Sequence, residues 1–247
     1  MSGSYDPALR SVLVPLGDDL RGLLGDDLVG LYLYGSVVVG GYDPGVSDLD
    51  LVAVTRRGVE QLDLAALDRV HHKVVARDPC WLDRLDIVYV AQSTVAGSIG
   101  QDSVAVISPG ESFHVTGPAS DWLQNWYLVR ETGVALQGPP PADVLAPISR
   151  AQFLAAVRAY LDYLRGTQSL GYAVLSACRA FRTLNTGAPC SKQEGAGWVR
   201  DRMPNCAWLI DAALANRVSR GTGFDDVKTR SAARRFVELL SSQARTI

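Results

Sequence analysis

Two short segments constrain the fold of this chain more than any other feature. An apolar run at residues 31–34 ends at Gly35 and Ser36, and after eleven further residues Asp48 and Asp50 flank a leucine at the start of a second apolar run. Residues two apart on a strand share a face, with Cα atoms about 6–7 Å apart. The pattern predicts a strand that ends in a glycine-serine turn, followed by a strand that opens with two carboxylates on one face.

This arrangement of residue types is suited to a nucleoside triphosphate. A glycine-serine turn offers backbone N–H groups and the Ser36 hydroxyl to phosphate oxygens. Two carboxylates can hold Mg²⁺, which takes oxygen ligands and keeps phosphates in its remaining positions. The alternative is a solvated turn of acids. The apolar run at residues 51–54 argues against it, because carboxylates at the mouth of a covered strand are costly without a cation. We therefore predict that Asp48 and Asp50 bind metal.

Asp86 is the expected third acidic member of the site. It is the one acid in the apolar run at residues 85–90, which reads as another strand. We expect it beside the first pair, where it would either accept the proton of an attacking hydroxyl or serve as a further metal ligand. The alternative is a structural ion pair with Arg84 or Arg77.

Lys192 marks a second candidate site. The sequence Ser-Lys-Gln-Glu at residues 191–194 is a capping-box pattern, so a helix is expected to begin there. The free N–H groups at such a helix start attract anions, and Lys192 adds positive charge. Lys192 as an ordinary surface charge is the alternative. Glu194 is expected to be a capping partner and not a catalyst.

Several segments resemble one family. Residues 35–50, Gly-Ser-Val-Val-Val-Gly-Gly-Tyr-Asp-Pro-Gly-Val-Ser-Asp-Leu-Asp, are similar to the signature of the aminoglycoside adenylyltransferases that modify streptomycin and spectinomycin. The segment 131–139 is similar to the one that closes that family's catalytic domain. Segments 176–179, 186–187 and 191–198 resemble its helical domain.

The resemblance implies an α/β (α+β) nucleotidyltransferase-fold N-terminal domain with a small mixed sheet, followed by an all-α helical bundle. It implies that ATP and Mg²⁺ are used to transfer AMP to a drug hydroxyl, with release of pyrophosphate. The roles carried over by position are phosphate binding by Gly35, Ser36 and Ser47, metal binding by Asp48 and Asp50, base catalysis by Asp86 in place of the family's glutamate, and nucleotide binding by Arg179 and Lys192.

The chain departs from the family where the drug and the nucleotide are recognised. Two acidic residues that bind the cationic drug in the family align with Arg165 and Ser169, and a nucleotide-contacting tyrosine aligns with Leu239. Two alternatives to antibiotic modification therefore stay open. One is an adenylyltransferase of the same fold that acts on a protein, an RNA or an anionic metabolite. The other is a nucleotide-binding sensor without turnover.

Charge is distributed unevenly between the two halves of the chain. Residues 1–139 carry nine Lys and Arg against eighteen Asp and Glu, a net charge of −9, whereas residues 140–247 carry fifteen against eight, a net charge of +7. In a binding cleft, a basic surface neutralises the charge of a triphosphate, and an acidic surface attracts cations. ATP and a small hydroxyl acceptor are the expected partners, and nucleic acid is the less favoured one.

Length and composition indicate an ordinary globular protein. With 247 residues, 47% of them hydrophobic, the chain can form two modest domains. The longest uncharged apolar tract, residues 28–42, is shorter than the ~20 residues that a membrane helix needs. The N-terminus has no secretory pattern, and the four cysteines form no Cys-x-x-Cys pair. We expect a cytoplasmic monomer.

Prolines suggest where the domains divide. Pro139 to Pro141 and Pro147 disfavour continuous helix or central strand, which predicts a catalytic domain at residues 1–146 and a helical domain of about five helices at residues 147–247. An N-terminal helix at residues 6–24 is expected to be interrupted near Pro15. His71 and His72 fall on a helix that is expected to be exposed, and we assign them no chemistry.

Overall fold

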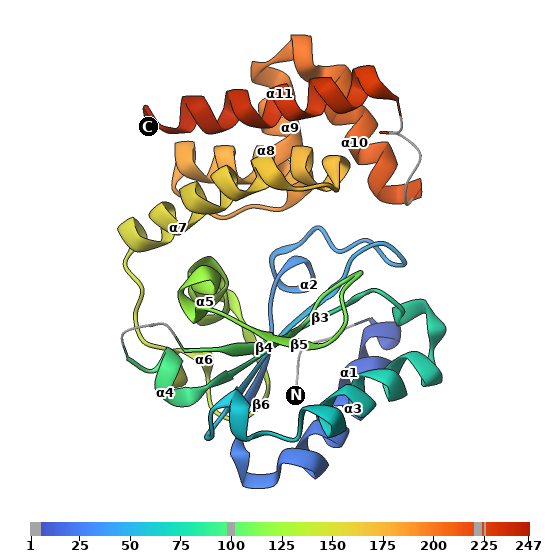
Figure 1. Cartoon of the computed structure of the whole chain (residues 1–247), viewed down its shortest axis with the longest axis vertical. Coiled ribbons are helices and arrows are strands. Elements are labelled where there is room, and N and C mark those ends of the chain that lie inside the picture. The colour runs from blue at the N-terminus through green and yellow to red at the C-terminus, as the bar shows by residue number, and fades with distance from the viewer. Residues whose placement is uncertain (1–5, 98–101, 220–223, 225) are drawn as a thin grey trace. The chain divides into compact units, whose positions relative to one another are not determined.

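The computed structural model describes residues 6–97, 102–219, 224 and 226–247 and divides into two compact units, Met1–Ile148 and Ser149–Ile247 (Figure 1). The first unit is a mixed sheet with helices. Its strands are β1 (Leu28–Leu33), β2 (Leu49–Thr55), β3 (Leu85–Ala91), β4 (Val104–Ile107), β5 (His114–Thr116) and β6 (Val134–Gln137). Its helices are α1 (Pro7–Leu24), α2 (Ser36–Val39), α3 (Leu64–Arg77), α4 (Gln92–Val95), α5 (Leu123–Thr132) and α6 (Pro141–Val144).

The strands form one six-stranded sheet in the order β5-β4-β3-β2-β1-β6. β2 and β3 pair in parallel, while the neighbouring pairs on either side are antiparallel. A parallel pair needs a crossover connection, and α3 supplies it between β2 and β3. The parallel pairing brings the first residues of β2 and β3 to the same edge of the sheet.

Two apolar layers cover the two faces of this sheet. Alternate strand residues such as Leu51 and Ile87 join α1 and α3 in one core cluster. The residues between them, such as Val52 and Val88, join α5 and the segment around Ile148 in another. This alternation is the period of two that a pleated strand imposes. The runs are apolar throughout because each strand is covered on both faces.

α1 runs from Pro7 to Leu24 without a break, so the expected interruption near Pro15 was wrong. A proline inside a helix removes one backbone hydrogen bond. Here the residues around Pro15, among them Val12, Leu16 and Leu20, are buried against the sheet. Burial of this face outweighs the lost hydrogen bond and keeps the helix continuous.

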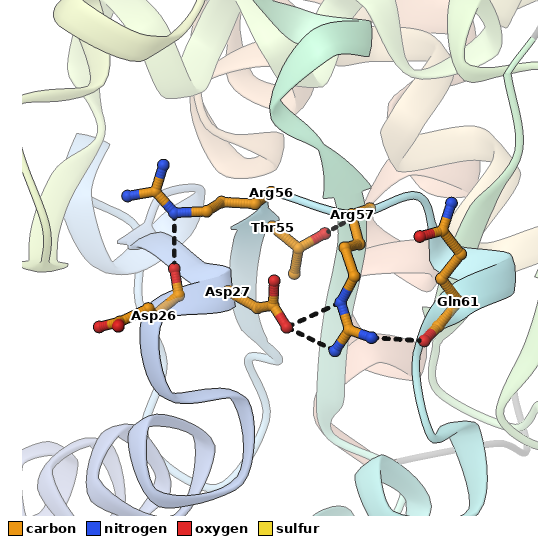
Figure 2. A network of polar contacts seen from close by, with 6 residues as sticks. All are labelled: Asp26, Asp27, Thr55, Arg56, Arg57 and Gln61. Carbon is orange, nitrogen blue, oxygen red and sulfur yellow. Dashed lines mark hydrogen bonds and ion pairs between the residues drawn. The ribbon is translucent and has the colours of Figure 1, made fainter.

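A polar network fixes the end of β2 that lies farthest along the strand from Asp50 (Figure 2). Arg57 forms an ion pair with Asp27, which precedes β1, and its Nη1 donates to the Gln61 carbonyl at 3.2 Å. Arg56 Nε donates to the Asp26 carbonyl at 2.8 Å. The network ties β2 to the start of β1.

His71 is buried inside the first unit, which contradicts the expectation that it is exposed. Its side chain lies between α3 and the sheet and is 2% exposed. Its Nε2 lies 2.8 Å from the Tyr89 hydroxyl, and the Phe113 ring packs edge-on against it at 4.9 Å. Nδ1 is buried with no hydrogen-bond partner among the described residues. The site therefore accommodates a neutral imidazole.

Acid should destabilise the protein through His71. Burial lowers the pKa of His71 to about 4; Asp68 raises this pKa by a smaller amount, and His72 lowers it further. An unfolded histidine titrates near 6.5, so between these values only the unfolded chain takes up the proton, and stability falls as the pH drops. We expect the wild type to lose about 2 kcal/mol of unfolding free energy through this group between pH 7.5 and pH 5. Urea unfolding at both pH values, compared with His71→Gln, measures it. Equal losses in the two proteins would contradict the assignment.

The second unit is helical in its described part. It contains α7 (Arg150–Tyr163), α8 (Leu170–Thr186), α9 (Lys192–Arg202), α10 (Ala207–Ser219) and α11 (Val227–Ala244). α8 packs against each of the other four helices and is the central element of the bundle. Gly187 ends α8 in the left-handed conformation, with φ of 71°. Within the described residues of the chain, no helix is both long and apolar enough to cross a membrane.

Candidate active site

The glycine turn at the end of β1 lies directly against Asp50. Gly35 has φ of 69°, a conformation that favours glycine. A Cβ atom added to Gly35 would lie 2.0 Å from the Asp50 Oδ2 atom. The Tyr34 N–H donates to the Asp50 carbonyl at 3.1 Å, which joins the turn to β2. Ser36 then begins the four-residue helix α2. Glycine is required here because the backbone touches the carboxylate.

Asp48 and Asp50 stand at the start of β2. Asp50 is the second residue of the strand and Asp48 immediately precedes it. Both are partly exposed, whereas the intervening Leu49 is fully buried in the core below α1 and α3. Leu49 thus anchors the strand on one face, and the two acids are placed on the other.

Asp86 lies beside Asp50 across the parallel β2 and β3 pair. Their Cα atoms are register partners, and neighbouring strands lie about 4.8 Å apart. Ser108, which follows β4, donates a hydrogen bond from Oγ to Asp86 Oδ1 at 2.9 Å. The arginines considered as structural partners of Asp86 are engaged elsewhere. Arg77 bonds to the Asp19 carboxylate at 2.7 Å, and Arg84 donates to main-chain carbonyl oxygens.

Arg84 and Ser47 hold the loop before β2. Arg84 is 2% exposed, lies over the Trp81 ring at 4.6 Å, and donates through Nε and Nη2 to the Ser47 carbonyl at 3.0 and 2.6 Å. The Ser47 hydroxyl accepts the Asp43 N–H at 2.9 Å. Arg84 was not predicted to be a positioning residue, because the sequence around it does not distinguish it from a surface arginine. Phosphate binding by Ser47 stays a prediction.

The carboxylates suit a metal site that the substrate completes. Among residues 6–97, 102–219, 224 and 226–247, no group of three or more His, Cys, Asp or Glu side chains is arranged to hold a metal ion. A site that consists of two carboxylates and leaves the other positions to phosphate oxygens and water is the usual one for Mg²⁺ in nucleotide enzymes. Asp48 and Asp50 are the two carboxylates that could form such a site, and metal binding by them stays a prediction.

Arg179 and Lys192 come from adjacent helices of the second unit. α9 begins at Lys192, and the capping box is formed, with Ser191 and Glu194 exchanging hydrogen bonds of 2.8 and 3.1 Å. Glu194 is thus a capping residue, as expected. Gly195 brings α9 against α8, because a Cβ there would lie 2.6 Å from the Arg179 Cα. Lys192 thus begins the helix that packs closely on α8 at Arg179.

The ring of Tyr172 packs against the Lys192 ammonium group. The Lys192 Nζ lies 4.3 Å from the centre of the Tyr172 ring, and the Tyr172 hydroxyl lies 2.6 Å from that of Tyr160. Attraction between an ammonium and an aromatic ring contributes about 0.5–1 kcal/mol at exposed sites.

If Lys192 binds the nucleotide, Tyr172→Leu should raise the KM for ATP about 2- to 5-fold. Tyr172→Phe keeps the ring and is the control. Steady-state kinetics with varied ATP gives the comparison, and equal KM values for the two variants would refute the role.

Two family models match the chain. Residues 19–99 match the nucleotidyltransferase domain, and residues 143–243 match the C-terminal domain of aminoglycoside adenylyltransferases. The first segment contains the glycine turn and the three aspartates, and the second contains Arg179 and Lys192. Together the matched segments cover more than half of the sequence.

A solved structure is similar over nearly the whole chain. Spectinomycin adenyltransferase AAD(9) from Enterococcus faecialis, crystallised with ATP and spectinomycin, aligns with a TM-score of 0.77 and 16% sequence identity. The alignment covers 96% of this chain and 99% of that one. At this level of identity the likeness establishes the shared fold: a nucleotidyltransferase domain followed by a helical region.

Proposed function

The chain belongs to the aminoglycoside adenylyltransferase family and is a nucleotidyltransferase, and on this premise we propose that it transfers AMP from ATP to a hydroxyl group of an aminocyclitol or aminoglycoside antibiotic. The observation that carries the proposal is the placement of Asp50 beside Asp86 and against Gly35. A carboxylate that can bind metal, one that can accept a proton, and a phosphate-binding turn thus lie at one edge of the sheet.

The residue roles follow from this placement and from the family. Asp48 and Asp50 would hold Mg²⁺, and the bound ion would neutralise the phosphate charge that develops during transfer. The backbone at Gly35 and the hydroxyls of Ser36 and Ser47 bind the triphosphate. Arg179 and Lys192 bind the nucleotide from the helical region, with the N-terminal end of α9 adding its N–H groups. We assign residues 1–146 to the catalytic domain and residues 147–247 to the helical domain, a boundary within two residues of the division between the two compact units.

Asp86 is the base of the proposed reaction. Its carboxylate takes the proton of the acceptor hydroxyl, and the hydroxyl oxygen forms a bond to the α-phosphorus. The bond between the α-phosphorus and the bridging oxygen breaks, and pyrophosphate leaves from the opposite side. The products are an AMP ester of the acceptor and pyrophosphate. Asp50, beside Asp86, belongs to the metal pair, so one carboxylate binds metal and the other accepts the proton.

The helical region does not require an anionic acceptor. Arg165, which takes the place of an acidic drug-binding residue of the family, forms an ion pair with Glu238 of α11. Its charge is therefore balanced inside the unit. AAD(9), which shares the fold, was crystallised with spectinomycin, a hydroxylated aminocyclitol. These observations favour the antibiotic over a protein, an RNA or an anionic metabolite. Because the reaction uses ATP, we propose the cytoplasm as its location.

Pyrophosphate release tests the proposed function. The purified protein is incubated with MgATP and, separately, with spectinomycin, streptomycin and other aminoglycosides. We expect release that depends on one or more of these drugs and disappears when EDTA removes the magnesium. If the protein binds MgATP but none of the drugs leads to release of pyrophosphate, antibiotic adenylylation is refuted. Protein, RNA and anionic metabolite acceptors would then be tested in the same assay.

A further inference from the structure

Ser108 stands at the end of β4, directly across from the proposed base. β3 and β4 are antiparallel, and Ile87 is the register partner of Ile107. The next pair outward is therefore Asp86 and Ser108. Side chains that face each other in this way have Cβ atoms about 4.5–5.5 Å apart. The hydrogen bond from Ser108 Oγ to Asp86 Oδ1, at 2.9 Å, joins them.

The two side chains share the face of the sheet that carries Asp50. Along β4, Val104 and Val106 belong to the same core cluster as Val88 and Val90 of β3. Two residues further on, Ser108 has the same orientation as Val106, as Asp86 has with Val88. Asp86 is thus flanked by Asp50 from β2 and by a hydroxyl from β4. One neighbour is an acid, and the other is a donor.

We propose that Ser108 is a positioning residue that holds the Asp86 carboxylate ready to accept the proton of the acceptor hydroxyl. This inference rests on the proposed function of Asp86. The carboxyl torsion of aspartate is broad and roughly two-fold. A donor fixed on Oδ1 selects one orientation of the carboxyl group. The backbone of Ser108 is held independently, because its carbonyl accepts the Glu111 N–H at 3.0 Å.

Kinetics of Ser108→Ala and Ser108→Thr test the proposal. Removal of a hydrogen bond to a charged group should lower kcat about 10-fold in Ser108→Ala and leave the KM for ATP unchanged. Ser108→Thr keeps the hydroxyl and should retain most of the activity. Ser112→Ala, in the same loop and exposed, is the matched control and should behave like the wild type.

A second measurement separates this proposal from the proposed function. Carbon-detected NMR of the aspartate carboxyl groups at one fixed pH, with Asp86→Asn to assign the signal, reports on the Asp86 carboxyl group without any acceptor. Its signal should shift in Ser108→Ala, where the hydrogen bond is lost, and stay in place in Ser108→Thr. An unchanged signal in Ser108→Ala, or a kcat equal to that of the wild type, would overturn the positioning role. A wild type that is inactive with every acceptor would refute the proposed function instead, and the NMR signal would still decide whether Ser108 holds Asp86.

Discussion

Replacement of Asp50 by asparagine is expected to lower the rate of AMP transfer about 10³-fold or more, which corresponds to about 4 kcal/mol of transition-state stabilisation. Asparagine has nearly the same shape but carries no charge. It therefore keeps the fit against Gly35 and loses the attraction for magnesium. The acid lies at the strand start, partly exposed, so its neutralisation should leave the fold intact. Pyrophosphate release under saturating MgATP and drug measures the rate, and thermal unfolding verifies the fold.

Asp83→Asn is the matched control for this variant. Asp83 is exposed, lies three residues before Asp86, and has φ of 54°, which asparagine tolerates well. The same loss of charge close to the site should change the rate less than 2-fold, because charges on the solvated surface interact weakly. An Asp50→Asn protein as active as the wild type would exclude Asp50 from metal binding. Equal losses in both variants would point to a general effect of charge.

Replacement of Gly35 by alanine is expected to cause the second largest loss. The added Cβ would lie 2.0 Å from the Asp50 Oδ2 atom, so the turn or the carboxylate must move. The backbone also has φ of 69°, where side chains are strained. We expect about 2–4 kcal/mol of lost stability and at least a 10²-fold lower rate, because small displacements of catalytic groups are costly. Urea unfolding and pyrophosphate release measure the two effects.

Gly25→Ala separates strain from collision. Gly25 ends α1 with φ of 54°, and a Cβ there meets no atom within 4 Å. It lies at the end of β1 remote from the turn. This variant should therefore lose about 1–2 kcal/mol of stability through backbone strain alone and keep its catalytic rate. If Gly35→Ala resembled Gly25→Ala in both measurements, close contact between the turn and Asp50 would not be required.

The central strands and their acids could be predicted because the signal is local. Apolar runs of strand length that carry one or two acids at their start define β2 and β3. The helix between them was also expected, whereas the parallel pairing of β2 and β3 is known from the structure alone. The capping box at Ser191 could also be predicted from the sequence, since its partners are three residues apart. The α/β domain and the five described helices that follow it were expected on these grounds.

The rest depends on contacts between distant residues. β4 and β5 are short strands of four and three residues, so their periodicity is too brief to detect, and Ser108 was missed with them. Arg165 and Glu238 are 73 residues apart in sequence, and no local pattern pairs them. His71 resembles a surface histidine beside His72, and only the packing of α3 on the sheet buries it.

The most direct test of antibiotic adenylylation is the chemical identity of the product. The protein, MgATP and spectinomycin or streptomycin are incubated, and the drug is analysed by mass spectrometry while pyrophosphate is measured in parallel. We expect a drug ester that is heavier by one AMP group, formed one for one with pyrophosphate and absent with Asp50→Asn. Unmodified drug in every incubation, from a protein that binds MgATP, would contradict it.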